Sequence, residues 1–151
     1  TRASGLKATT MSNGVIDGLK AVGAKRVAVA TAYNETVNER LQAFLREHAL
    51  EPVVITGLGI EAMTDIEKVS QQDLVDFCVR VRKSAPGADA LFVSCGGFRT
   101  LEIIAPLEAL TGVPVISSMP HGLWAGARLA GLSGAAPGYG ALLSGPQPPR
   151  G

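Results

Sequence analysis

This sequence has few cysteines and few aromatic residues, and its positive and negative charges nearly balance. Two cysteines in 151 residues, Cys78 and Cys95, cannot build a disulfide scaffold, so a reduced, cytoplasmic setting is expected. The formal net charge is only +1, which gives no electrostatic basis for binding nucleic acid or an anionic membrane. No apolar run reaches the ~18 residues that a membrane-spanning helix needs. The sequence therefore predicts a globular protein with no nucleic-acid partner and no membrane partner.

Glycine is abundant, and short apolar runs alternate with segments of helical period. The 18 glycines suit an α/β protein with many tight strand-to-helix turns. Strands that alternate with helices favour a parallel sheet with right-handed crossovers. We therefore expect an α/β fold with three layers around a four-stranded parallel sheet of the flavodoxin or Rossmann type. Pro106 predicts a kink or an early start within one helix. The expected strands are 26–30, 52–56, 88–94 and 113–116, and the expected helices are 13–22, 34–48, 71–83, 100–110 and 121–129.

The two ends of the chain carry separate signals. Gly5–Ser12 faintly resembles Gly112–Met119, because in both a short strand follows glycine, ends in hydroxyl residues and leads into a helix. The repeat predicts that residues 1–12 are the end of an earlier α/β unit that lies upstream. The alternative is that residues 6–9 form an edge strand of a single domain. The tail 138–151 is rich in Gly and Pro and is expected to be flexible.

Cys95 has the clearest functional signal. It follows a buried apolar run and precedes Gly96 and Gly97, as expected where a parallel strand ends at a tight turn. Ligands of open α/β sheets bind at the carboxyl ends of the strands, and glycines there let backbone N–H groups approach an anion. A thiol at this place can act as an acid, a base or a nucleophile. The other cysteine, Cys78, lies mid-helix on an apolar face and is expected to be a small buried hydrophobe.

A glycine-rich motif indicates a different function. Gly57–Ala62 reads Gly-Leu-Gly-Ile-Glu-Ala, which fits the dinucleotide-binding pattern and follows an expected strand. However, it follows the second strand of the unit, and position 77, where an acidic strand end is expected, is Phe77 within a helix. A nucleotide-binding module therefore stays an alternative. His121 could be a base, but a lone histidine near a helix start is more often a residue of the first turn. The two histidines and two cysteines form no zinc pattern.

Five stretches carry a further signal through their order and spacing: Thr9–Ser12, Val27–Tyr33, Val37–Leu41, Ser94–Gly97 and Gly112–Ser118. Together they resemble the arylmalonate decarboxylase family, whose wider kin are the aspartate/glutamate racemases, the hydantoin racemases and the maleate cis–trans isomerases. The resemblance extends to about Tyr139. It implies one half of a two-domain, pseudo-symmetric fold with the active site between the domains. Residues 13–117 would then be the second domain, and 118–137 the helix that returns to the first.

The resemblance implies roles for single residues. Cys95 matches the family's proton-donating cysteine, Gly96 a backbone N–H that binds a substrate carboxylate, and Tyr33 a tyrosine whose hydroxyl joins the same anion-binding group. Gly97 belongs with these substrate-binding residues, and Ser94 is a candidate for a further contact. The family's other donors, a Thr-Ser pair of the first domain, fall before this chain begins.

The implied reaction is the cofactor-independent decarboxylation of an arylmalonate or another small dicarboxylate. Loss of CO2 leaves an enediolate, which hydrogen-bond donors stabilise and the thiol of Cys95 protonates on one face. Neither a metal nor an organic cofactor is required. Arg99, a candidate carboxylate contact, departs from the decarboxylase pattern and is more similar to the maleate isomerases. A cis–trans isomerisation, or a racemisation that uses a second cysteine from a missing first domain or a partner copy, is therefore one alternative. A non-catalytic α/β module is another.

Overall fold

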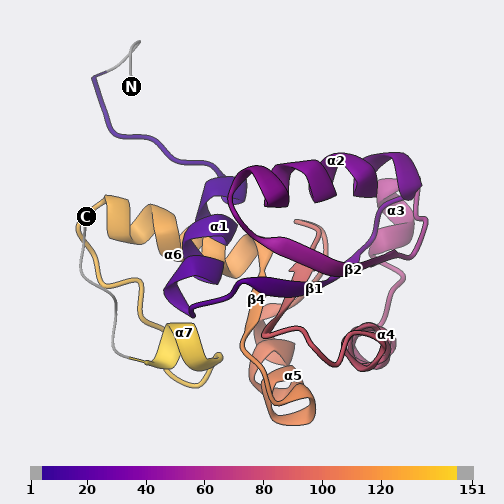
Figure 1. Cartoon of the computed structure of the whole chain (residues 1–151). Coiled ribbons are helices and arrows are strands. Elements are labelled where there is room, and N and C mark those ends of the chain that lie inside the picture. The colour runs from indigo at the N-terminus through magenta and orange to yellow at the C-terminus, as the bar shows by residue number, and fades with distance from the viewer. Residues whose placement is uncertain (1–4, 146–151) are drawn as a thin grey trace.

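A sheet of four parallel strands lies between two layers of helices in the computed structural model, which describes residues 5–145 (Figure 1). The order across the sheet is β2-β1-β3-β4. This confirms the expected α/β fold class. The strands are β1 (Arg26–Thr31), β2 (Glu51–Gly57), β3 (Ala90–Ser94) and β4 (Val115–Ser117).

The expected helices are present, with ends that shift by at most three residues. The helix expected over 100–110 is a 3-10 turn, η1, followed by α5, and Pro106 lies in the first turn of α5, where a helix needs no N–H donor. The helix expected from His121 begins three residues earlier, directly after β4. The main helices are α1 (Met11–Ala21), α2 (Glu35–Glu47), α4 (Gln71–Ser84), η1 (Leu101–Ile103), α5 (Ile104–Thr111) and α6 (Ser118–Leu129).

The core has two parts, one on each face of the sheet, because successive side chains of a strand point to opposite faces. Ala28 and Leu91 face the cluster that α4 and α5 cover. Val29 and Phe92 face the other cluster, to which α1, α2 and α6 contribute. All five residues of β3 are buried, as expected for a central parallel strand.

The direction of the chain crossovers reverses between β1 and β3. The chain moves from β1 to its neighbour β2 on one side and then crosses back to β3 on the other side. A crevice outside the carboxyl ends of the strands is expected at such a point in open α/β sheets. The register brings Thr31, at the end of β1, beside Ser94, at the end of β3. Residues that follow these two positions therefore meet at one edge of the sheet.

Helices α1 and α6 follow the two copies of the faint repeat and pack against each other. Their contact is close at Gly14, where an added Cβ would lie 2.8 Å from the Cα of Gly122 and 2.9 Å from the carbonyl oxygen of His121. Residues 7–10, which precede α1, belong to no strand in the described part of the chain. The alternative of an edge strand over 6–9 is therefore wrong.

Two four-residue helices were not expected, α3 (Met63–Ile66) and α7 (Ala141–Ser144). Helix α7 lies in the expected flexible tail and corrects that expectation for residues 138–145. The rest of the expected tail, residues 146–151, lies outside the described range. Leu142 and Leu143 are buried in the core beside α1. The Ala141 N–H also donates to a carboxylate oxygen of Glu108 at 2.7 Å. Apolar burial and this hydrogen bond hold a segment whose Gly and Pro content indicated a loop.

Candidate active site

Buried polar side chains gather at the carboxyl ends of the strands. This arrangement is unusual for a core, because a buried polar group is costly unless it is hydrogen-bonded. Its members end a strand or follow one closely, which makes this edge of the sheet the candidate site. Among the described residues they are Thr31, Ser94, Thr100, Ser117, Ser118 and His121.

Cys95 lies one residue beyond β3, and only 4% of its surface is exposed. The N–H of Gly97 donates to its sulfur at 3.3 Å, which fixes the position of the thiol. Gly96 is exposed, and within residues 5–145 its N–H has no hydrogen-bond partner. The turn after β3 therefore directs the N–H of Gly97 to the sulfur and leaves the N–H of Gly96 for a ligand.

Tyr33 follows β1 and reaches the same place. Burial raises the pKa of its hydroxyl, a hydrogen bond with the side chain of Ser94 lowers it, and the nearby Cys95 raises it. These interactions bring together three of the residues singled out in the sequence. Arg99 does not join them: it is exposed, and its guanidinium forms no ion pair with any residue from 5 to 145.

A cavity of about 310 Å³ opens beside Tyr33 and Ser94. Its walls come from α1, α2 and β3 and are largely apolar, with Ser118 from the start of α6 among its hydroxyl groups. The side chain of Met11 lies between the turn after β3 and α6, since an added Cβ would meet its thioether at 3.5–3.6 Å from Gly96 and its Cγ at 3.0 Å from Gly122. The sequence did not indicate Met11 or Ser118, although both lie in stretches used for the family resemblance.

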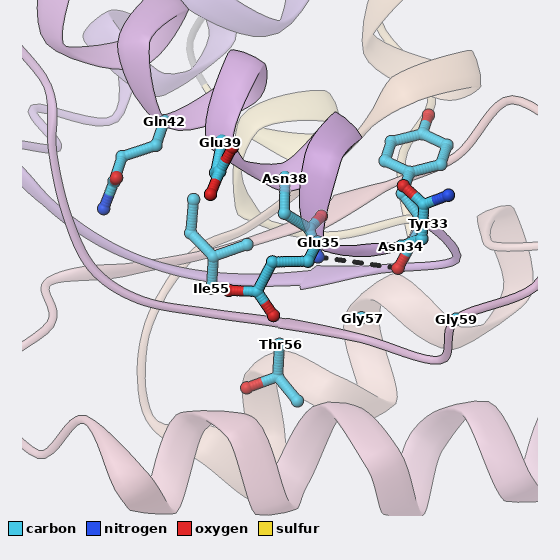
Figure 2. A pocket seen from close by; sticks show the side chains of 10 residues that line it. All are labelled: Tyr33, Asn34, Glu35, Asn38, Glu39, Gln42, Ile55, Thr56, Gly57 and Gly59. Atoms are coloured by element: carbon cyan, nitrogen blue, oxygen red, sulfur yellow. Dashed lines mark hydrogen bonds between the residues drawn. The ribbon is translucent and has the colours of Figure 1, made fainter.

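A second cavity, of about 490 Å³, lies between α2 and the end of β2 (Figure 2). It includes Gly57 and Gly59 of the motif that fits a dinucleotide-binding pattern. In that pattern the glycines open a helix whose N-terminus binds the pyrophosphate. Here the next helix is the four-residue α3, which starts at Met63 without a side-chain cap. The surroundings of the motif do not suit a dinucleotide.

Cys78 and His121 are buried titratable residues that take no part in the contact between Tyr33, Ser94 and Cys95. Cys78 is fully buried in α4, and burial raises the pKa of its thiol to about 12, which confirms the expectation of a buried hydrophobe. His121 is 1% exposed, and its Nδ1 lies 3.0 Å from both the backbone N and the backbone O of Ser117. Burial lowers the pKa of His121 to about 4, so its ring is neutral at pH 7 and serves the packing of α6.

Neither a metal centre nor a membrane span is found in the described residues. From 5 to 145, no three His, Cys, Asp or Glu side chains gather as metal ligands would. None of the helices in this range combines the length and the apolar content that a bilayer crossing requires.

Comparison with known proteins identifies relatives of this chain. A sequence model of the arylmalonate decarboxylase family matches residues 1–143. The curated arylmalonate decarboxylase of Bordetella bronchiseptica is 50% identical over 142 residues, which are 93% of this chain and 59% of that protein. The structure of unliganded arylmalonate decarboxylase superposes with a TM-score of 0.88 at 48% identity and covers 95% of this chain and 61% of its own.

A maleate isomerase is also similar. The isomerase Iso from Pseudomonas putida S16 superposes with a TM-score of 0.82 at 31% identity, covering 90% of this chain and 54% of its own. The chain thus spans between 54% and 61% of the lengths of these three relatives.

Proposed function

Because this chain belongs to the arylmalonate decarboxylase family, we propose that the complete protein decarboxylates an arylmalonate or a similar α-substituted malonate without a cofactor. One observation carries the proposal: the thiol of Cys95, the free N–H of Gly96 and the hydroxyl of Tyr33 lie at one edge of the sheet. The activity belongs to the complete protein in this proposal, because the chain spans only 59% of its curated relative.

The first step breaks the bond between the α-carbon and one carboxylate. CO2 leaves, and the electron pair of that bond passes into an enediolate formed with the second carboxylate. Donors aimed at the oxygens of this enediolate stabilise the charge that develops there, and one such donor is typically worth ~3 kcal/mol of barrier. Tyr33 and the N–H of Gly96 supply two donors in this proposal. The remaining donors come from the part of the protein that precedes this chain.

The second step is proton transfer from Cys95. The S–H proton passes to the α-carbon and leaves a thiolate, which regains a proton from water before the next turnover. The Gly97 N–H that donates to the sulfur also stabilises this thiolate, because hydrogen bonds to an ionised acceptor are stronger than those to a neutral one. A thiol fixed on one side of a planar enediolate delivers its proton to one face. The product is then a single enantiomer.

The missing half of the site comes from a first domain in this proposal, with a second copy of the chain as the alternative source. Exposed apolar side chains on α6 support a covering partner: Leu123 is 67% exposed and Met119 is 40% exposed. Residues 1–12 would then end the first domain, 13–117 form the second, and 118–137 return to the first. Cytoplasmic location stays a prediction from cysteine usage.

Isomerisation of maleate, or racemisation, is the second candidate. It is favoured by the likeness to maleate isomerases and by Arg99, which lies exposed just beyond the candidate site. Either reaction needs a second group on the opposite face of the substrate, outside this chain.

The test uses the complete protein with phenylmalonate and, separately, maleate. We expect release of CO2 from phenylmalonate and its loss in Cys95→Ser, while Cys78→Ser, at the other cysteine, retains turnover per folded molecule. Conversion of maleate with no action on phenylmalonate would favour isomerisation. Undiminished decarboxylation by Cys95→Ser would refute the role of the thiol.

A further inference from the structure

Thr31 is a fully buried residue at the end of β1, yet its side chain is polar. Its hydroxyl accepts a hydrogen bond from the N–H of Tyr33 at 3.1 Å. The same hydroxyl donates to Oδ1 of Asn38 at 2.7 Å. One bond of this buried group is thus made to the backbone of Tyr33 and the other to Asn38, near the start of α2.

Asn38 continues the connection from the first turns of α2. Its Nδ2 donates to the carbonyl oxygen of Tyr33 at 3.5 Å, the bond drawn as a dashed line in Figure 2. The N–H of Gly59 donates to the same oxygen at 3.2 Å. The backbone of Tyr33 is thus held at its N–H and at its carbonyl, by residues from three separate segments.

Gly57 shows how tightly this arrangement is closed. A Cβ at this position would lie 2.0 Å from the carbonyl oxygen of Tyr33, 2.7 Å from Nδ2 of Asn38 and 2.9 Å from Oγ1 of Thr31. No side chain fits there, so the loop after β2 can approach the Tyr33 turn only with glycine. This accounts for the first glycine of the apparent dinucleotide motif without any nucleotide.

We propose that Thr31 and Asn38 are positioning residues, which hold Tyr33 in the orientation where its hydroxyl binds the substrate carboxylate. The inference rests on the proposed function, since it needs Tyr33 to act on the substrate. Removal of the Thr31 hydroxyl takes away the partner of the Tyr33 N–H and of Asn38 Oδ1, so it costs stability as well, and the positioning role is tested by kcat per folded molecule. The orientation of Tyr33 depends on these bonds, and a catalytic donor loses much of its effect when displaced by about 1 Å.

A double-mutant cycle in the complete protein tests this role. Thr31→Val should lower kcat for phenylmalonate about 10-fold in the native background. In the Tyr33→Phe background the same substitution should change kcat by less than ~2-fold, because it acts only through the lost hydroxyl. Thr31→Ser retains the hydroxyl and should restore most of the activity. Thr56→Val, at an exposed threonine of β2, is the matched control and should leave kcat unchanged.

Asn38→Asp is a second, nearly isosteric variant for the same cycle, because it removes the Nδ2 donor to the Tyr33 carbonyl. It replaces Thr31→Val in the cycle if that variant does not fold. An equal loss of kcat in both backgrounds would overturn the positioning role and leave the proposed function intact. Native kcat in both Thr31→Val and Asn38→Asp would overturn it as well. Native kcat in Tyr33→Phe would instead refute the role of Tyr33 itself, and with it this inference.

Discussion

The contact between α1 and α6 makes a sharp prediction about Gly14. Alanine at this position would bring a Cβ to 2.8 Å from the Cα of Gly122, 2.9 Å from the carbonyl oxygen of His121 and 3.0 Å from the Cβ of Ala125. Two of these atoms are backbone, which cannot rotate away. The two helices must therefore separate to admit one methyl group.

Gly126 is the matched control, since it is also a helical glycine and an added Cβ there meets nothing within 4 Å. Alanine in place of a helical glycine stabilises by roughly 0.5–1 kcal/mol, and this gain applies at both positions. Overpacking costs about 1–3 kcal/mol, and it applies only at Gly14. We expect Gly126→Ala to raise the free energy of unfolding by roughly 0.5–1 kcal/mol. Gly14→Ala should lower it by about 2 kcal/mol, near the upper end of that overpacking cost less the helix gain.

Urea denaturation of this chain, followed by far-ultraviolet circular dichroism, measures both effects. The corresponding thermal shifts are a fall in Tm of roughly 4–8 °C for Gly14→Ala and a rise of about 2 °C for Gly126→Ala. If Gly14→Ala proved as stable as Gly126→Ala, the close approach of α1 and α6 would be wrong.

Two further predictions concern His121 and Leu143. Burial lowers the pKa of His121 from 6.5 to about 4, so between these values the unfolded chain binds more protons than the folded one. The free energy of unfolding should therefore decrease by roughly 3 kcal/mol as the pH falls from 6.5 to 4. Denaturation measured across that pH range should show a flatter slope for His121→Gln. An unchanged slope would contradict the lowered pKa of His121. Leu143→Ala should cost about 3 kcal/mol of unfolding free energy, because Leu143 is 3% exposed, whereas Leu132→Ala, at a side chain 63% exposed, should be nearly neutral. Equal effects of the two leucine variants would place α7 outside the core.

Much of the fold follows from local patterns. Apolar runs of four to seven residues that alternate with helical periodicity predicted all four strands, and the order of elements indicated a parallel sheet. Asn34 and Ser70 lie where the expected helices begin, and each accepts a hydrogen bond from the N–H three residues ahead. These features depend on neighbours in the sequence, which is why they could be predicted.

The candidate site was predicted only in part. The abrupt end of an apolar run at Cys95, followed by two glycines, indicated a strand end without further information. Tyr33 came from the family resemblance, because a tyrosine after a strand has no distinctive pattern of its own. Thr31 and Asn38 were not singled out, since a threonine that ends a strand and an asparagine in a helix are each ordinary. Their importance appears only in the bonds they make.

The tail shows the opposite case. Composition predicted a loop from 138, and α7 forms because Leu142 and Leu143 find a buried surface beside α1. Local propensity disfavoured this segment, and burial decided it. In the same way Gly57 was taken as part of a possible nucleotide motif, while its surroundings show that it permits two loops to approach.

The sequence by itself determined the order and kind of the four strands and the main helices, the family, and the place of a thiol at the end of a strand. These features follow from the hydrophobic periodicity and from the residues at turns, which act over a few neighbouring positions. Only the tertiary structure decided that β1 and β3 are neighbours, which brings Tyr33, Ser94 and Cys95 together. The reason is that strand order is set by how whole elements pack, so contacts between distant strand ends leave no local trace in the chain.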